Sequence, residues 1–367
     1  MGHVFTEVSF TFFFTSKFAT VFLQGVMCIL TAAVDAHDDF GLVITHTRDE
    51  YFARRASELD VRDGILAAVD AATGGTWMGL NTQTGHVAAL TNVRLPPVPG
   101  TKSRGELVLR ALKGEGAAAV ASDEYACYNL LHGSLRSDGG AAKLFLSVNA
   151  PPATSTDQVG TPFIGGKSND HGSAWTVPMS DPDHACTWPK VAWLTAAVQG
   201  VLRGERLRDA SGEVGFRRLL DELAPVLCAR SLPEPYARRA LHAGKAASPL
   251  PAQDEQRLQV APFVAPFNLP GSSNGVIGSD DFLYGTVSQS VLVQSRSDGC
   301  VYYAYRECRP TMTEETERPD ASTARGGASR RSSRKRVRSD GGVREVNWPW
   351  TWRRVKLSEP QPGDEAR

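Results

Sequence analysis

The sequence predicts an α+β fold in which antiparallel β-sheets are covered by helices. Strand-like runs separated by short polar turns occupy the first part of the chain, up to about residue 92. Two stretches with apolar residues at helical spacing follow in the middle, and strand-like runs return near residues 287–305. This order favours antiparallel sheets, because a parallel sheet requires strands and helices to alternate along the chain.

The first strands are predicted to form a hairpin. The apolar run Cys28–Val34 and the β-like run Gly41–Thr47 are joined by the short polar segment Asp35–Asp39, which is typical of antiparallel neighbours. Further strands are predicted at Ile65–Val69 and His86–Asn92. Together these runs predict a sheet-rich first part of the domain.

Two local patterns predict a close backbone approach and a helix start. Gly74 and Gly75 precede Thr76, and glycine lets a backbone turn or approach another chain segment closely. Ser103 and Glu106 have the spacing of a capping box before an apolar-periodic stretch. We therefore expect a helix whose N-cap is Ser103.

The middle and the end of the chain supply the remaining elements. Apolar residues at helical spacing predict amphipathic helices over residues 191–202 and 216–227. Lys143–Val148 is predicted as a strand. Val287–Gln294 and Val301–Tyr305 flank an Asp-Gly pair, which predicts a second hairpin because glycine accepts a positive φ.

The chain divides into one large domain and several flanking segments. Residues 1–26 are interpreted as sequence upstream of a true start at Met27, with a targeting segment or a structural extension as the alternatives. Residues 27–310 form the predicted domain. Residues 311–343 are predicted to be a disordered basic insertion. Residues 344–358 are predicted to return to the domain as an edge strand, and 359–367 to be a disordered tail.

The bulk composition excludes several classes of function. Hydrophobic residues make up 41% of the 367 residues and the net charge is zero, so the core is not expected to bind nucleic acid. No uninterrupted apolar stretch is long enough to cross a membrane. The six cysteines are widely spaced and the histidines lack ligand spacing, so we expect free thiols, a cytoplasmic location and no metal site.

The most suggestive residues for chemistry are Cys28 and the pair Arg48-Asp49. If Met27 is removed, Cys28 carries both a thiol nucleophile and an α-amine, which titrates near about 8 and can act as a base. A neighbouring Arg48 would favour the thiolate, and Asp49 could orient the amine or the guanidinium. The alternative is that Cys28 is a buried core residue and Arg48-Asp49 a surface ion pair.

Several motifs in order resemble the NRDE family, also described as the transport and Golgi organisation protein 2 family. Met27-Cys28 resembles the family's start, and Thr47-Arg48-Asp49-Glu50 resembles its Asn-Arg-Asp-Glu motif. Further blocks that match the family are Gly74–Gly79, Ala88–Asn92, Ser103–Val108, Tyr128–Leu131 and Tyr284–Thr286. The resemblance extends over about residues 27–307.

The resemblance implies a four-layer αββα sandwich like that of the N-terminal-nucleophile hydrolases. Carried over to this chain, Cys28 would be the nucleophile and its own amine the base, with Arg48 and Asp49 lining the pocket. Asn92 would donate a hydrogen bond to an oxyanion or to the ligand, or would only cap a strand end. The implied ligand-binding set is Thr47, Glu50, Trp77, Asn92 and Tyr284.

This chain departs from the family pattern at three positions. Thr47 replaces the Asn of the motif, Ala174 follows Ser173 where Asn is usual, and Val287 follows the Tyr-Gly-Thr block where Arg is usual. Because Ala174 and Val287 each remove a polar group, catalysis is less expected than binding.

The resemblance implies a non-catalytic or weakly catalytic binder of a hydrophobic ligand. Haem and acyl-CoA or another lipid-derived molecule are the expected ligands. The expected roles are Golgi organisation, protein secretion, or mitochondrial and lipid homeostasis, with peripheral association with the Golgi or mitochondria. The first alternative is an N-terminal cysteine amidohydrolase. The second is a scaffold that uses the basic run Arg330–Arg338 as a nuclear signal for an import factor or as a polyanion site.

Overall fold

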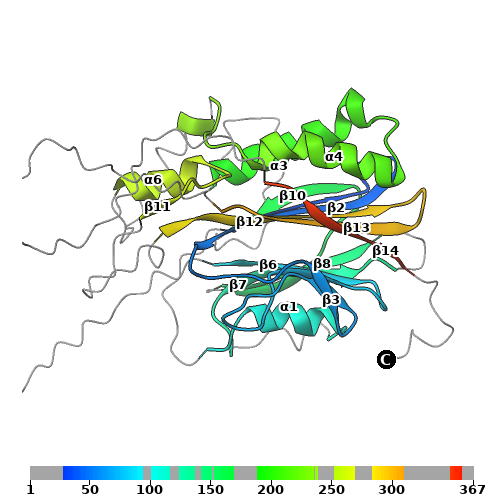
Figure 1. The fold of residues 1–367 in the computed structure, drawn as a ribbon, viewed down its shortest axis with the longest axis horizontal. Coiled ribbons are helices and arrows are strands. Elements are labelled where there is room, and N and C mark those ends of the chain that lie inside the picture. Colours follow the sequence, from blue (N-terminus) through cyan, green and yellow to red (C-terminus); the bar gives the residue numbers. More distant parts are fainter. Residues whose placement is uncertain are drawn as a thin grey trace, which may run out of the picture.

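The computed structural model describes residues 28–93, 101–115, 124–136, 142–150, 153–168, 188–234, 236–238, 252–268, 283–309 and 348–357. In this part of the chain, two stacked antiparallel sheets lie between helical layers (Figure 1). Helices α3 (Pro189–Arg203) and α4 (Gly212–Leu227) cover the outer face of one sheet, and α1 (Gly105–Leu112) covers the other. The α+β sandwich predicted from the sequence is confirmed.

The first sheet contains the predicted N-terminal and C-terminal hairpins side by side. Strands β1 and β2 pair from Ile29 with Thr47 to Val34 with Leu42. Strand β2 also pairs along its length with β12, so segments far apart in the sequence become neighbours. The strand order is β10 (Phe163–Lys167), β1 (Ile29–Val34), β2 (Phe40–Tyr51), β12 (Leu283–Ser295), β13 (Cys300–Glu307), β14 (Thr351–Lys356), with β11 (Phe267–Asn268) beside β12.

The second sheet follows the order of its strands along the sequence. Each strand pairs antiparallel with the next, so the connections are local. Its strands are β3 (Asp60–Arg62), β4 (Ile65–Ala67), β5 (Met78–Asn81), β6 (His86–Asn92), β7 (Tyr128–Ser134), β8 (Lys143–Ala150) and β9 (Ala153–Gln158).

Successive side chains of a strand point to opposite faces of its sheet, so the apolar residues of one strand belong to two different buried layers. On β1, Leu30 and Ala32 pack between the two sheets, whereas Ile29 and Ala33 pack against α3 and α4. Strand β13 alternates in the same way, with Tyr303 between the sheets and Tyr302 under α4. Three buried layers result, one between the sheets and one under each helical cover.

The predicted capping box at Ser103 is wrong in detail. Helix α1 begins at Gly105, its N-cap residue is Arg104 with helical φ and ψ of −60° and −23°, and no side chain caps it. The Glu106 carboxylate instead accepts a hydrogen bond from the Tyr125 hydroxyl. A Cβ on Gly75 would lie 2.7 Å from Gly105 Cα, so tertiary contact between the two backbones determines where the helix begins.

Further helical segments among the described residues are α6 (Ala252–Val260), the short 3₁₀ turn Glu205–Leu207 and residues 236–238. Strand β14 follows Pro349 and lies at the edge of the first sheet, where it pairs with β13. The segments 1–26 and 311–343, the tail 359–367, Ala174 and the basic run Arg330–Arg338 lie outside the described residues. The described helices are too short or too polar for a membrane span.

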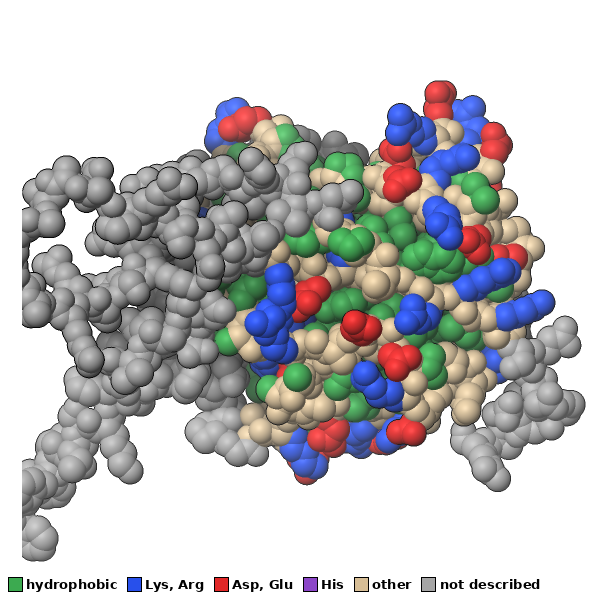
Figure 2. Space-filling view, viewed as in Figure 1, with side chains coloured by type: hydrophobic (Ala, Val, Ile, Leu, Met, Phe, Trp, Pro, Cys, Tyr) green, Lys and Arg blue, Asp and Glu red, His purple; other side chains and the backbone are tan. Residues whose placement is uncertain are grey.

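Both signs of charge are interspersed over the visible face of the described surface (Figure 2). This distribution matches the zero net charge of the chain.

Candidate functional site

Strand β2 presents alternate side chains to two different environments. Arg48 and Glu50 point toward the second sheet, where both line a cavity. Asp49 points the other way, because its Oδ1 accepts a hydrogen bond of 2.6 Å from the Thr286 hydroxyl, and the charge of Lys190 on α3 acts on it. The Arg-Asp-Glu motif is therefore divided between the two faces of the strand.

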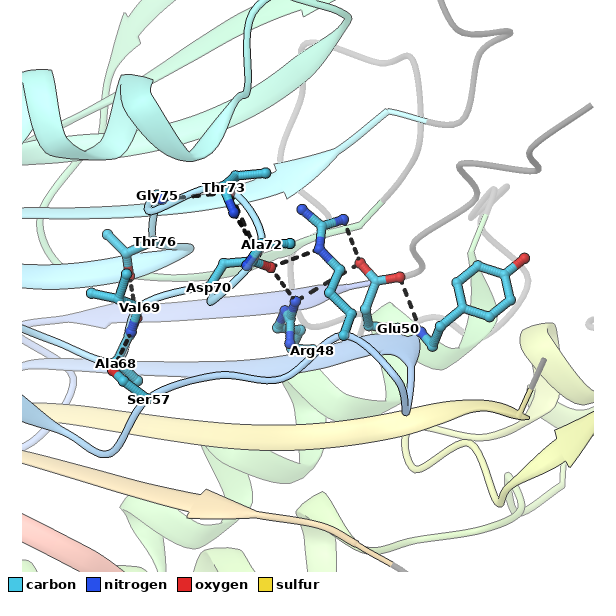
Figure 3. A network of polar contacts seen from close by, with 12 residues as sticks. Arg48, Glu50, Ser57, Ala68, Val69, Asp70, Ala72, Thr73, Gly75 and Thr76 are labelled. Atoms are coloured by element: carbon cyan, nitrogen blue, oxygen red, sulfur yellow. Dashed lines mark hydrogen bonds and ion pairs between the residues drawn. The ribbon is translucent and has the colours of Figure 1, made fainter. Parts of the chain in front are cut away.

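A buried carboxylate joins two arginines on the cavity side (Figure 3). Asp70 follows β4, and its Oδ2 lies 2.7 Å from Arg48 Nη2 and 2.7 Å from Arg54 Nε. Its Oδ1 accepts hydrogen bonds from the backbone N–H groups of Ala72 and Thr73. All of these partners donate, so Asp70 is fixed by charge-assisted contacts between the two guanidinium groups.

Glu50 extends the same network on the other side of the two arginines from Asp70 (Figure 3). Its Oε2 accepts a hydrogen bond of 2.9 Å from Arg54 Nη1 and lies 3.9 Å from Arg48 Nη2. The Arg48 guanidinium also lies 4.6 Å from the centroid of the Trp77 ring. This stacking and the two ion pairs hold Arg48 in one orientation.

The cavity has a volume of about 460 Å³ and opens between the two sheets. Its wall combines charged side chains with an apolar part of similar area, which includes Trp77 and Leu90. Of the predicted site residues, it brings together Cys28, Arg48, Glu50, Trp77 and Asn92.

Cys28 lies directly before β1, at the wall of the cavity. Its carbonyl accepts a hydrogen bond of 2.9 Å from the Ser168 hydroxyl, which holds the backbone in place. Burial and the nearby Asp49 carboxylate raise the pKa of the thiol to about 12, although Arg48 and the Asp49 backbone N–H act in the opposite direction. The thiol is therefore protonated near neutral pH, because burial outweighs the neighbouring Arg48.

Three predicted site residues lie away from the cavity wall. Thr47 is buried on the helix side of β2, and Asp49 lies on that side as well. Burial raises the pKa of Asp49 to about 7, although Lys190 and the Thr286 hydroxyl lower it. Tyr284 packs edge-on against Tyr51 in an apolar cluster with Leu258, Val264 and Phe267.

Val287, which stands where the family pattern usually has Arg, lies in an apolar environment. Its side chain is 6% exposed and packs in an apolar cluster with Phe52 and Leu283. An apolar side chain thus occupies the position where the resemblance leads one to expect a guanidinium.

Sequence reasoning missed the residues that complete the charged wall, Asp70, Arg54 and Arg104. Asp70 follows a short strand with no recognisable motif around it, so only the fold brings it to Arg48. Arg104 was recoverable, because it belongs to the matched Ser-Arg-Gly-Glu block, which was interpreted only as a helix start.

The comparison with known families identifies the family of the chain. A family model described as Transport and Golgi organisation 2 matches residues 27–307, which is well over half of the chain. The chain therefore belongs to the Transport and Golgi organisation 2 family, as the resemblance to the NRDE motifs indicated. Among curated proteins, no match to the chain was found.

Proposed function

We propose that this member of the Transport and Golgi organisation 2 family binds a small lipid-derived amphiphile in the cavity around Cys28, without covalent chemistry. The observation that carries the proposal is the composition of the wall. Ionised Arg48, Glu50 and Asp70 suit a polar head group, and Trp77 and Leu90 suit the start of an apolar chain. The protonated Cys28 thiol supports binding over nucleophilic attack.

The two ligands implied by the family fit the cavity differently. Haem iron needs an axial ligand such as His, Cys, Met or Tyr. The lining offers Tyr51, whose pKa is raised by burial, and the protonated thiol of Cys28, so these residues do not fit haem ligation well. Acyl-CoA fits better, because its phosphates suit the arginines of the wall.

The proposed cellular roles remain those of the family description, transport and Golgi organisation. We propose a cytoplasmic protein with peripheral association with the Golgi or mitochondria, acting in secretion or lipid homeostasis. The basic run Arg330–Arg338 is a proposed site for an import factor or a polyanion.

A second candidate function is an N-terminal cysteine amidohydrolase. It is favoured by one observation, that Cys28 and Asn92 line the same cavity. An attacking thiol and an amide donor on one wall are what acyl transfer requires. This function also needs a free amine on Cys28.

Titration with palmitoyl-CoA by isothermal calorimetry tests the proposal. We expect the wild type to bind, and Cys28→Ser to bind within about threefold of it, because the thiol makes no ion pair with the head group. Protein with Cys28 as its first residue is assayed in parallel for hydrolysis of N-palmitoyl-glycine.

The outcomes separate the two functions. Hydrolysis that Cys28→Ser abolishes would establish the amidohydrolase and overturn non-covalent binding as the main role. Absence of palmitoyl-CoA binding by the wild type would refute the proposed function. The variant Glu213→Gln, in an exposed ion pair on α4, is the matched control for handling and folding.

A further inference from the structure

Arg104 differs from the other two arginines of the cavity wall. Arg48 and Arg54 each lie within 4 Å of both Asp70 and Glu50. Arg104 Nη1 donates a hydrogen bond to the Cys127 carbonyl at 3.0 Å. Within the described residues, no carboxylate lies in ion-pair distance of the Arg104 guanidinium.

The surroundings disfavour this uncompensated charge. Burial lowers the pKa of Arg104 to about 10, and the positive charge of Arg54 contributes in the same direction, whereas Cys28 and Glu50 oppose the shift. Arg104 is partly buried, and a guanidinium that is partly desolvated and feels the charge of a second arginine gains more from an added anion than a fully solvated one does.

The backbone around Arg104 is held tightly. Arg104 directly precedes α1, and the next residue, Gly105, packs against Gly75 with no room for a Cβ on either glycine. Both glycines line the cavity. The N–H groups at the start of α1 add a partial positive charge at the same end of the cavity. The cationic side chain is therefore presented from a rigid position.

The other cation near this end of the cavity is differently placed. Lys102 forms an ion pair of 3.1 Å with Glu124, and its side chain is 48% exposed. Its charge is already compensated and solvated, so Lys102 offers little selectivity.

We propose that Arg104 recognises a carboxylate or phosphate group of the bound amphiphile and makes the cavity selective for anionic ligands. This inference rests on the proposed function, since it assigns the polar group of the same ligand. The paired Arg48 and Arg54 then shape the wall. Arg104, which has no carboxylate partner among the described residues, forms two parallel hydrogen bonds with the anion.

The test compares three lipids with the same oleoyl chain and different head groups. Oleate carries a carboxylate, oleoyl lysophosphatidate a phosphate, and monooleoylglycerol no charge. Binding of each, below its critical micelle concentration, is measured by competition with a fluorescent fatty-acid analogue. We expect the wild type to bind at least one anionic lipid about tenfold or more tightly than the neutral one, which corresponds to one charge-assisted pair.

Arg104→Gln should remove this preference. Its affinity for the anionic lipid should fall by about tenfold or more, while its affinity for monooleoylglycerol stays within about twofold. Arg104→Lys keeps the charge without the planar fork, and should retain a weakened preference. Arg110→Gln, on the outer part of the same helix and paired with Glu115, is the control and should keep the wild-type preference.

Each result has a distinct meaning. Equal binding of charged and neutral lipids by the wild type, or an unchanged preference in Arg104→Gln, would overturn the inference and leave the binding function standing. Binding of none of the three lipids and no binding of palmitoyl-CoA would reject the proposed function itself. A preference for oleate over lysophosphatidate would identify the carboxylate as the recognised group, and the reverse preference the phosphate. If Arg104→Gln fails to fold by circular dichroism, the preference of Arg104→Lys decides the question.

Discussion

Charged side chains have different surroundings on the two faces of strand β2. On the cavity face, Arg48 and Glu50 are paired with groups of opposite charge, because Asp70 and Arg54 complete a network of alternating charges. On the helix face, Asp49 is fully buried and burial raises its pKa to about 7. One short motif therefore lines the cavity with one set of side chains and contributes to packing between sheet and helices with the other.

This contrast gives the consecutive residues of the motif different roles. Arg48 and Glu50 are accessible to a ligand in the cavity, whereas Asp49 can affect that ligand only through the position of β2. We expect substitutions on the cavity face to change binding and stability together. Substitutions on the helix face should change stability and its pH dependence while leaving head-group selectivity unchanged.

The largest expected effect is on the cavity face, in Asp70→Asn. This variant removes the nearer of the two carboxylates beside the buried guanidinium of Arg48 and leaves only Glu50 at 3.9 Å, and loss of one partner of a buried ion pair destabilises by about 3–5 kcal/mol. Urea unfolding followed by circular dichroism measures the change. The control Glu213→Gln breaks an exposed pair and should change stability by less than about 1 kcal/mol. Equal effects in the two variants would contradict the view that the network holds this end of the cavity together.

The second effect is the pH dependence conferred by Asp49. Its pKa is about 7 in the folded protein against an ordinary value of 3.8, so the folded state binds the proton more tightly. The resulting stability is fully present below about pH 4 and is lost as the pH rises through 7. A shift of about three units corresponds to at most roughly 4 kcal/mol.

Asp49→Asn isolates this contribution from those of other groups. The difference in unfolding free energy between the wild type and Asp49→Asn is measured from pH 5 to 8.5. We expect the wild type to lose stability relative to the variant as the pH rises, because the variant has no carboxyl to ionise. If the wild type instead became more stable than Asp49→Asn above pH 7, the charge of Lys190 would compensate the ionised Asp49 fully. The two faces of β2 would then not differ in how they accommodate charge.

The difference between the wild type and Asp49→Asn is used because buried histidines change the unfolding free energy with pH in the direction opposite to Asp49. Burial lowers the pKa of His46 to about 4, while its Nε2 makes a hydrogen bond of 2.9 Å to the Leu90 carbonyl across the two sheets. The stability due to the neutral imidazole is lost as the pH falls below its unfolded value of about 6.5 toward 4. This loss is common to the wild type and the variant and cancels in the difference.

A smaller effect is expected for Thr286→Val on the helix face. The Thr286 hydroxyl donates to Asp49 Oδ1 and accepts from the Val264 backbone N–H at 2.8 Å. Valine keeps the shape but leaves both groups without this partner, which destabilises by about 1–3 kcal/mol. Because the hydroxyl lowers the pKa of Asp49, its loss should also move the pH-dependent step to higher pH.

Thr286→Ser supplies the matched control, since it retains the hydroxyl. It should show the wild-type position of the pH-dependent step with a small loss of packing. If Thr286→Val and Thr286→Ser gave the same pH profile, the hydroxyl would not control the ionisation of Asp49.

The elements with strong local patterns were predictable. The hairpins around Asp35–Asp39 and Asp298-Gly299 were found from polar turns between β-like runs, and Gly299 has the expected positive φ of 65°. Helices α3 and α4 were found from apolar spacing. Strand β9, with the sequence Ala-Thr-Ser-Thr-Asp-Gln, was missed because it has few apolar residues and depends on its pairing with β8.

The candidate site was predictable only in part. Cys28, Arg48, Glu50, Trp77 and Asn92 meet at one cavity, as the motifs suggested. Asp70 and Arg54 could not be paired with Arg48 from sequence, because ion pairs between separate segments depend on the packing of the two sheets.

By itself, the sequence determined the family, the alternation of buried and exposed side chains along the strands, and the order of strands and helices. These follow from local periodicity and from motifs in order, which need no knowledge of distant contacts. Only the tertiary structure decided that Arg48 pairs with Asp70, that Asp49 is buried on the opposite face, and that Arg104 faces the cavity without a carboxylate partner among the described residues. Such facts depend on which charges the folded chain brings within a few ångströms of one another, and on how much water it leaves around them.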